Sequence, residues 1–348
     1  MLKLPRPSVE RIDVTNPTGP DLAALPSIDT IPDEAQRKGL LQRAFFALCV
    51  LYAAWHLYTL NIAPLETWTF RILHVAGALT LGFALSAAVA GDVQRSSRFA
   101  LAFGIVALAV TLWAGVCLAV MATAAEPGGP AWASSQFGWV LGAGGILAVV
   151  AGWLGGTQSG RISLWDWAAI AASLIASGFI LMSLDALSLR LRAGTPFADP
   201  NNAWAAFVLV LLILELTRRV AGLALVVIAL VFLGYSFLGP WLPGFLEHRG
   251  YDAKRFFSYI YTDNGILGPT TAVSSTYIIL FIIFAAFLQT SKVGDYFVNF
   301  AFAVAGRARG GPAKVSVFAS GLMGMINGTS AGNVVSTGSL TIPLMKKV

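Results

Sequence analysis

Long apolar runs separated by short polar segments constrain this 348-residue chain more than any other feature. A helix needs about 20 apolar residues to cross the hydrocarbon core of a bilayer, which is about 30 Å thick. Runs that meet this requirement, alone or joined, lie at 44–65, 72–90, 99–122, 139–154, 165–184, 203–216 leading into 220–238, and 271–288. Charged residues make up only 11% of the chain, against about a quarter in soluble domains. The sequence therefore predicts an all-α polytopic membrane protein with about seven or eight transmembrane helices.

The sixth and seventh runs leave the number of helices open. The run 203–216 is short for a crossing, and Arg218 and Arg219 interrupt its continuation into 220–238. These residues could form two helices or one long tilted helix.

The positions of Lys and Arg indicate the orientation of the helices. Positively charged loops tend to stay in the cytoplasm. The positive clusters precede the first run and follow the second, fourth and sixth, whereas segment 123–137 carries none; Arg71, Arg190 and Arg192 are exceptions to the pattern. The clusters are Arg37 with Lys38 and Arg43, Arg95 with Arg98, Arg161, and Arg218 with Arg219. We therefore expect the N-terminus to be cytoplasmic, with residues 1–40 as a flexible polar tail. Because the net charge of +6 is spread among these clusters, no nucleic-acid partner is expected.

Few residues before the C-terminal segment suggest chemistry. Cys49 and Cys117 lie inside apolar runs without the spacing of a metal site. Motifs for nucleotide binding, zinc proteolysis and serine hydrolysis do not occur, so we expect no enzymatic activity and no cofactor. His56 and His74 could carry protons. A lone membrane histidine that binds a backbone carbonyl is the favoured interpretation for each of them.

Three carboxylates near the ends of runs are expected to reach water: Asp166, Asp185 and Glu215. Glu215 also stands three and four residues before Arg218 and Arg219, a spacing at which helical side chains meet. We expect such a pair to be structural.

Two segments rich in aromatic residues are expected to lie along the membrane surface, and the second of them is also too short to span a bilayer. Segment 239–270 carries His248, Lys254 and Arg255 beside aromatic residues, which predicts a periplasmic interfacial helix. Anchoring in membrane lipid at the headgroup level is favoured there over docking of a partner. Segment DYFVNFAFAVAG (295–306) is bounded by Lys292 and Arg307, which predicts a helix lying along the cytoplasmic interface.

The segment 310–348 contains two half-length apolar runs, 312–326 and 334–344, joined by the polar tip NGTSAGN (327–333). Irregular backbone is tolerated at membrane depth only where it lines a cavity or is buried in protein. Helix ends at such a tip offer carbonyls to Na⁺ and amides to a carboxylate. Thr329, Ser330 and Asn333 add neutral oxygen ligands that can bind an alkali ion and release it. These features predict a re-entrant helical hairpin that binds an ion and a solute.

A plainer interpretation of the same segment remains. Gly324, Gly328 and Gly332 recur every four residues, as on the packing face of a continuous helix, although the polar tip favours the hairpin. The other hydroxyl residues are interpreted as helix-packing groups: Ser316, Ser320, Ser336, Ser339 and Thr341.

Three stretches of the chain resemble a known family. They read LELTRRVAGLALVVIALVFLGYSFLGPWLPGFLEHRGY (214–251), GILGPTTAVSSTYIILFIIFAAFLQTSKVGDYF (265–297) and GGPAKVSVFASGLMGMINGTSAGNVVSTGSLTIPLMKKV (310–348). Each is similar to the fused membrane permease of tripartite ATP-independent periplasmic (TRAP) transporters. Within that family the chain looks most like the permeases associated with TAXI-type receptors.

The resemblance implies an elevator-type secondary transporter of the bacterial or archaeal inner (cytoplasmic) membrane. Such a permease would import a small organic acid by Na⁺ symport, with Na⁺ as coupling ion, and a periplasmic TAXI-type solute-binding protein would deliver the solute. Residues 41–238 correspond to small-subunit-like scaffold helices, and 239–270 to the periplasmic interfacial segment. Residues 271–348 correspond to the start of the large-subunit transport domain, with its interfacial arm helix and first hairpin. Because the second hairpin of that domain does not follow, the resemblance implies an N-terminal portion, an incomplete transporter.

The resemblance also assigns roles to the hairpin tip. The Na⁺ ligands would come from Asn327, Gly328, Thr329, Ser330 and Asn333, and the substrate wall from Thr329, Ser330 and Asn333. The usual family tip reads SGSSVANV, and the tip here, NGTSAGNV, keeps oxygen-bearing side chains at positions 327 and 329 while Gly332 loosens the start of the second half-helix. The alternative is a channel or a non-transporting membrane scaffold in which the hairpin is only a packing element.

Overall fold

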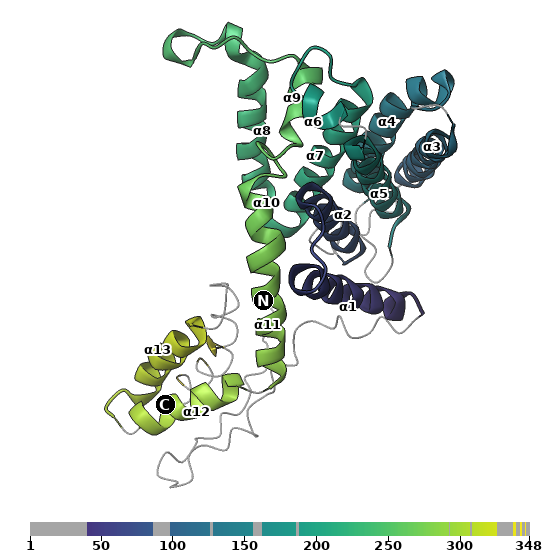
Figure 1. The fold of residues 1–348 in the computed structure, drawn as a ribbon. Helices are drawn as coiled ribbons and strands as arrows, with labels where there is room; N and C mark the ends of the chain where they lie inside the picture. The colour runs from purple at the N-terminus through teal and green to yellow at the C-terminus, as the bar shows by residue number, and fades with distance from the viewer. Residues whose placement is uncertain are drawn as a thin grey trace. The chain divides into compact units, whose positions relative to one another are not determined.

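The described part of the chain is built of helices joined by turns and short loops (Figure 1). The computed structural model describes residues 40–85, 98–125, 128–155, 162–185, 188–291, 293–306, 308–325 and positions 337, 338, 342 and 345. These residues fall into two compact units, Gly39–Ser275 and a second one that contains Thr276–Val348. An all-helical membrane protein is what the apolar runs predicted.

The first unit contains the bundle helices. They are α1 (Leu40–Asn61), α2 (Thr67–Leu85), α3 (Arg98–Thr123), α4 (Ala131–Gly155), α5 (Leu164–Asp185), the short α6 (Ser188–Arg192), α7 (Pro200–Ala221) and α8 (Leu223–Leu238). Within this unit α3, α4, α5 and α7 pack side by side, and α2 packs on α5 (Figure 1). Their shared core is formed by fully buried side chains such as Phe137, Leu141 and Leu209.

Glycines on α4 explain how closely its neighbours approach. A Cβ atom at Gly138 or Gly142 would come within 2.6 Å of the Trp204 ring on α7, and one at Gly144 would come within 2.4 Å of the Thr111 hydroxyl on α3. Small residues at such positions allow helix backbones in a membrane to pack tightly. The many glycines of this apolar run therefore serve contacts on two sides of α4.

Residues 200–238 form two helices and not one long tilted helix. Asp199 caps α7 by accepting a hydrogen bond from the Asn201 amide, and Pro200 occupies the first turn. Gly222 ends α7 with a φ of 86°, which favours glycine over residues with a Cβ atom. Helix α8 then begins at Leu223.

Six helices of the described residues are long and apolar enough to cross a membrane. They are Arg43–Asn61, Thr67–Leu85, Arg98–Thr123, Ala131–Gly155, Leu164–Leu184 and Leu223–Trp241. In the first and the last of these helices, only 11% of the residues of the most apolar stretch are buried inside the protein. Such exposure suits helices that face lipid.

The segment after α8 folds back on it before a short amphipathic helix. It contains two 3₁₀ turns (Gly239–Trp241 and Gly244–Leu246) and α9 (Ala253–Ile260). The His248 ring binds the Tyr235 carbonyl at 2.9 Å, and the Phe257 ring packs edge-on against Phe207 of α7 at 5.1 Å. The predicted helix is present, and its position at a membrane surface stays a prediction.

Helix α10 (Pro269–Val273) lies near the end of the first unit, and the π-helical turn that follows it (Ser274–Ile278) contains the last residue of that unit, Ser275. The second unit contains α11 (Ile279–Thr290), α12 (Val293–Ala305) and α13 (Gly311–Gly324). Helices α12 and α13 pack through a small core of Ala301, Ala305, Val315 and Ala319. A helix thus forms where the sequence predicted the arm helix.

Candidate functional site

A helix, α13, forms where the sequence predicted the first half of the hairpin. Gly310, with a φ of 71°, precedes the helix, and Pro312 lies in its first turn, where the missing amide hydrogen is not needed. Its 14 residues extend for about 21 Å, which is shorter than a full crossing. The Ser316 hydroxyl donates to the Ala313 carbonyl of the same helix, as expected of a packing hydroxyl.

The predicted ligands at the hairpin tip lie outside the described residues. These are Asn327, Gly328, Thr329, Ser330 and Asn333. Their roles in Na⁺ and substrate binding therefore stay predictions.

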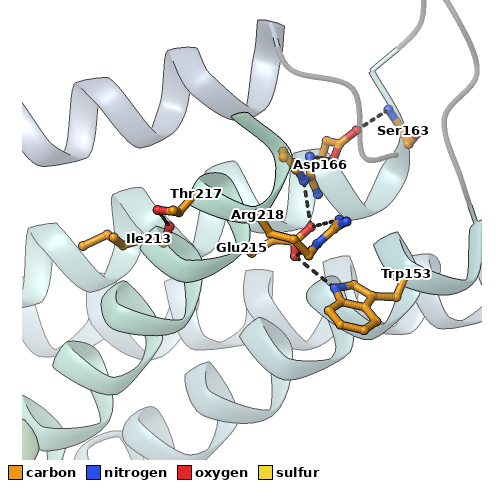
Figure 2. Close-up of polar contacts among 8 residues, drawn as sticks. Trp153, Ser163, Asp166, Ile213, Glu215, Thr217 and Arg218 are labelled. Carbon is orange, nitrogen blue, oxygen red and sulfur yellow. Dashed lines mark hydrogen bonds and ion pairs between the residues drawn. The ribbon is translucent and has the colours of Figure 1, made fainter. Parts of the chain in front are cut away.

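A buried cluster of charges joins α4, α5 and α7 (Figure 2). Glu215 accepts hydrogen bonds from Arg218 and Arg219 at 2.8 Å and from the indole nitrogen of Trp153 at 3.0 Å. Arg219 also donates to Asp166 at 2.7 Å, and Asp166 accepts a further bond from the Ser163 amide. Two carboxylates face two guanidinium groups, so the cluster is neutral as a whole.

Two of the carboxylates that we expected to reach water do not. Asp166 and Glu215 are each 3% exposed, because tertiary packing places both against Arg219. The expected pairing of Glu215 with Arg218 and Arg219 is confirmed, whereas the pair across α5 and α7 was missed. The sequence did contain a signal for this pair. Two acidic and two basic residues lie in otherwise apolar helices, and charges buried in such helices need partners of opposite sign. The Asp185 side chain is not among the described ones.

The two membrane histidines form a pair, which the sequence analysis did not predict. His56 Nδ1 lies 2.8 Å from the Tyr52 carbonyl, as favoured for a lone histidine. Its Nε2, however, lies 2.9 Å from His74 Nδ1, and His74 Nε2 lies 3.1 Å from the Ser274 hydroxyl. The Tyr52 hydroxyl donates to the His74 carbonyl at 2.8 Å. A hydrogen-bonded chain therefore runs from α1 through α2 to Ser274.

A cleft of about 690 Å³ lies beside this chain within the first unit. Its walls come from α2, α7 and the segment that includes α10, and most of its lining side chains are apolar, such as Leu79 and Leu216. His74, Thr271 and Ser274 provide polar groups to the lining. The cleft thus brings the end of the histidine chain to an accessible surface.

Comparison with known families gives a match over residues 208–348, to the model described as tripartite ATP-independent periplasmic transporter, DctM component. Residues 208–348, about two fifths of the chain, are similar to the DctM family. The matched part begins within α7, includes α8 to α13 and contains all five predicted tip residues. No curated protein and no solved structure matches the chain.

The matched residues are thus similar to a component of TRAP transporters, the family that the sequence resemblance named, and the six long apolar helices suit a multi-pass membrane protein. Members of the family work with a periplasmic solute-binding receptor. Helices α1 to α6 precede the matched region, and the match says nothing about them.

Proposed function

We propose that this chain is the permease part of a Na⁺-driven TRAP transporter that imports a small organic acid. The observation that carries the proposal is the DctM match, because it includes the whole hairpin segment. The described half of that hairpin, α13, is a short helix of the kind whose end can approach an ion at membrane depth.

The proposed solute is an anion, and its chemistry suits the tip. Amides at a helix N-terminus attract a carboxylate, while carbonyls and neutral hydroxyl oxygens attract Na⁺. Coupling follows when the two bind side by side, since each neutralises part of the charge that the other brings into the membrane. A TAXI-type receptor in the periplasm, an inner-membrane location and an elevator motion of the hairpin domain complete the proposal.

Uptake into proteoliposomes tests this function. The chain is reconstituted with its receptor and supplied with radiolabelled carboxylates such as succinate, pyruvate and glutamate. An inward Na⁺ gradient is expected to drive accumulation of at least one of them, and omission of the receptor is expected to abolish it. Uptake that ignores both Na⁺ and proton gradients would contradict the proposal, and unitary currents in a planar bilayer would instead indicate a channel.

A further inference from the structure

The hydrogen-bond chain that ends at the cleft has a fixed direction. The Tyr52 carbonyl can only accept, so the neutral His56 ring must carry its hydrogen on Nδ1. His56 Nε2 is then an acceptor, so His74 must donate from Nδ1. The Tyr52 hydroxyl lies 3.0 Å from the same Nδ1, but its hydrogen goes to the His74 carbonyl, so it does not require a lone pair on Nδ1. His74 Nε2 is left as an acceptor, and the Ser274 hydroxyl must donate to it. In the neutral pair, hydrogen therefore lies on Nδ1 of each ring.

From this arrangement we propose that the His56–His74 pair is a binding site for one proton, which enters from the cleft at His74 Nε2. The other three ring nitrogens are closed to solvent, since His56 Nδ1 faces a carbonyl and the remaining two face each other at 2.9 Å. His74 and Ser274 both line the cleft, which makes Nε2 the accessible lone pair of the pair.

Uptake of one proton keeps every hydrogen bond of the chain. The proton adds to the lone pair of His74 Nε2, and the Ser274 hydroxyl turns so that its oxygen accepts. The proton on His74 Nδ1 can then shift to His56 Nε2, which moves the positive charge from one ring to the other without breaking a contact. A second proton would place two N–H donors against each other at 2.9 Å, so the pair takes only one.

Aromatic rings enclose the inner histidine of the pair. The ring centroids of Tyr52, Trp55 and Phe70 lie 4.4, 4.6 and 5.6 Å from the His56 imidazole centroid, with T-shaped contacts. Because His56 is fully buried, the entry point for a proton is at His74.

The charged groups near the His56–His74 pair affect how readily it binds a proton. Arg71, one turn before His74 on α2, opposes it, although its guanidinium is bound by the Leu267 carbonyl at 2.6 Å. Tyr52 is the titratable neighbour from α1, and the cleft residues of α7 and 260–274 are uncharged. Among the described side chains of α5 the carboxylate is that of Asp166, and it is already paired with Arg219. Among the described residues that line the cleft there is no carboxylate, so the proton would bind without an anion beside it.

Nitrogen NMR of the full chain in lipid nanodiscs, labelled with ¹⁵N at histidine, tests the proposal. The chain has three histidines, so a His248→Gln variant leaves only the pair to be assigned. At neutral pH we expect hydrogen on Nδ1 of both rings. On acidification both rings should shift in a single transition that corresponds to one proton for two histidines.

Two serine variants separate the pair from general structure. Ser274→Ala removes the donor to His74 Nε2, so the Nε2 signal of His74 is expected to shift while hydrogen stays on Nδ1, which His56 still requires. Ser275→Ala is the matched control, because that buried hydroxyl donates to the Ala272 carbonyl of its own helical turn, and neither histidine signal should change. Hydrogen on Nε2 of either ring at neutral pH, uptake of two protons, or no uptake before the protein unfolds would each overturn the proposal. None of these outcomes bears on the hairpin, so the Na⁺ proposal is tested separately.

Discussion

The Asp166 carboxylate and the Arg219 guanidinium form an ion pair at 2.7 Å whose side chains are only 4% and 1% exposed. The two residues lie 53 positions apart and connect α5 with α7. Glu215 holds the other side of the same guanidinium at 2.8 Å. Arg219 is therefore the centre of the cluster, and its loss leaves two buried negative charges with fewer partners.

Arg219→Met is expected to destabilise the protein strongly. Removal of one partner from a buried ion pair costs about 3–5 kcal/mol, because the remaining charge stays in an apolar environment. The free energy of unfolding can be followed by tryptophan fluorescence during denaturation in detergent micelles. Arg190→Met is the comparison, because the Arg190–Glu66 pair is 39% and 46% exposed and exposed pairs contribute about 0–1 kcal/mol. Equal losses for the two variants would contradict this assignment.

Gly144→Ala is expected to weaken the contact between α3 and α4. The added methyl group would meet the Thr111 hydroxyl at 2.4 Å and the Thr111 backbone at 3.2 Å, and a backbone cannot move aside as a side chain can. Overpacking of this kind costs about 1–3 kcal/mol, which should lower the melting temperature.

Gly234→Ala on α8 provides the matched control for that substitution. A Cβ atom there has no neighbour within 4 Å among the described residues, and alanine stabilises a helix by up to about 1 kcal/mol relative to glycine. Its melting temperature should stay the same or rise. A fall as large as that of Gly144→Ala would show that the loss comes from helix chemistry and not from the α3–α4 contact.

Glu66, in the loop between α1 and α2, is expected to make stability depend on acidity. Partial burial raises the pKa of its carboxyl, but hydrogen bonds from the Thr69 and Trp68 amides, Arg190 and the Thr69 hydroxyl together outweigh it, and the net pKa is lowered. A lowered pKa in the folded state means that the contribution is present above the pKa of the unfolded chain and is lost as the pH falls through the folded value.

The Glu66→Gln variant isolates this contribution. The melting temperature of the unsubstituted chain should fall more steeply than that of the variant as the pH decreases through the range in which carboxyls titrate. At neutral pH the variant should be the less stable of the two. Parallel curves for the two proteins would show that Glu66 contributes nothing to the acid sensitivity.

The sequence predicted the helices well because the bilayer imposes a length on them. The apolar run 99–122 identified α3 (Arg98–Thr123), and the run 165–184 identified α5. A helix rises about 1.5 Å per residue, so the thickness of the bilayer fixes how many apolar residues it needs. The break at Gly222 was left open, because composition does not reveal a φ of 86°.

Partners across the bundle could not be predicted in the same way. Helix periodicity predicted the contact between Glu215 and Arg218, which are three residues apart on one helix. It does not predict which helices pack against one another. The pairing of His56 with His74 depends on how α1 packs against α2, and Asp166 meets Arg219 only because α5 and α7 are adjacent. The proposed binding of Na⁺ and solute at the hairpin tip, in contrast, was predicted from residue types alone, and it stays a prediction until it is tested by experiment.

The double substitution Thr329→Val with Ser330→Ala tests the hairpin chemistry directly. Both changes remove a hydroxyl oxygen at the tip while keeping nearly the same volume, so each should cost a Na⁺ ligand without an effect on membrane insertion. With about 0.5–1.5 kcal/mol for each of the two lost contacts, the Na⁺ concentration for half-maximal uptake should rise about fivefold or more. Ser316→Ala is the control, because its hydroxyl donates within α13 to the Ala313 carbonyl, and its Na⁺ dependence should not change. Insertion is checked from the amount of protein in the membrane fraction. A double variant that inserts normally and keeps the original Na⁺ dependence would remove the tip from the ion site, because two of its proposed oxygen ligands would then be dispensable.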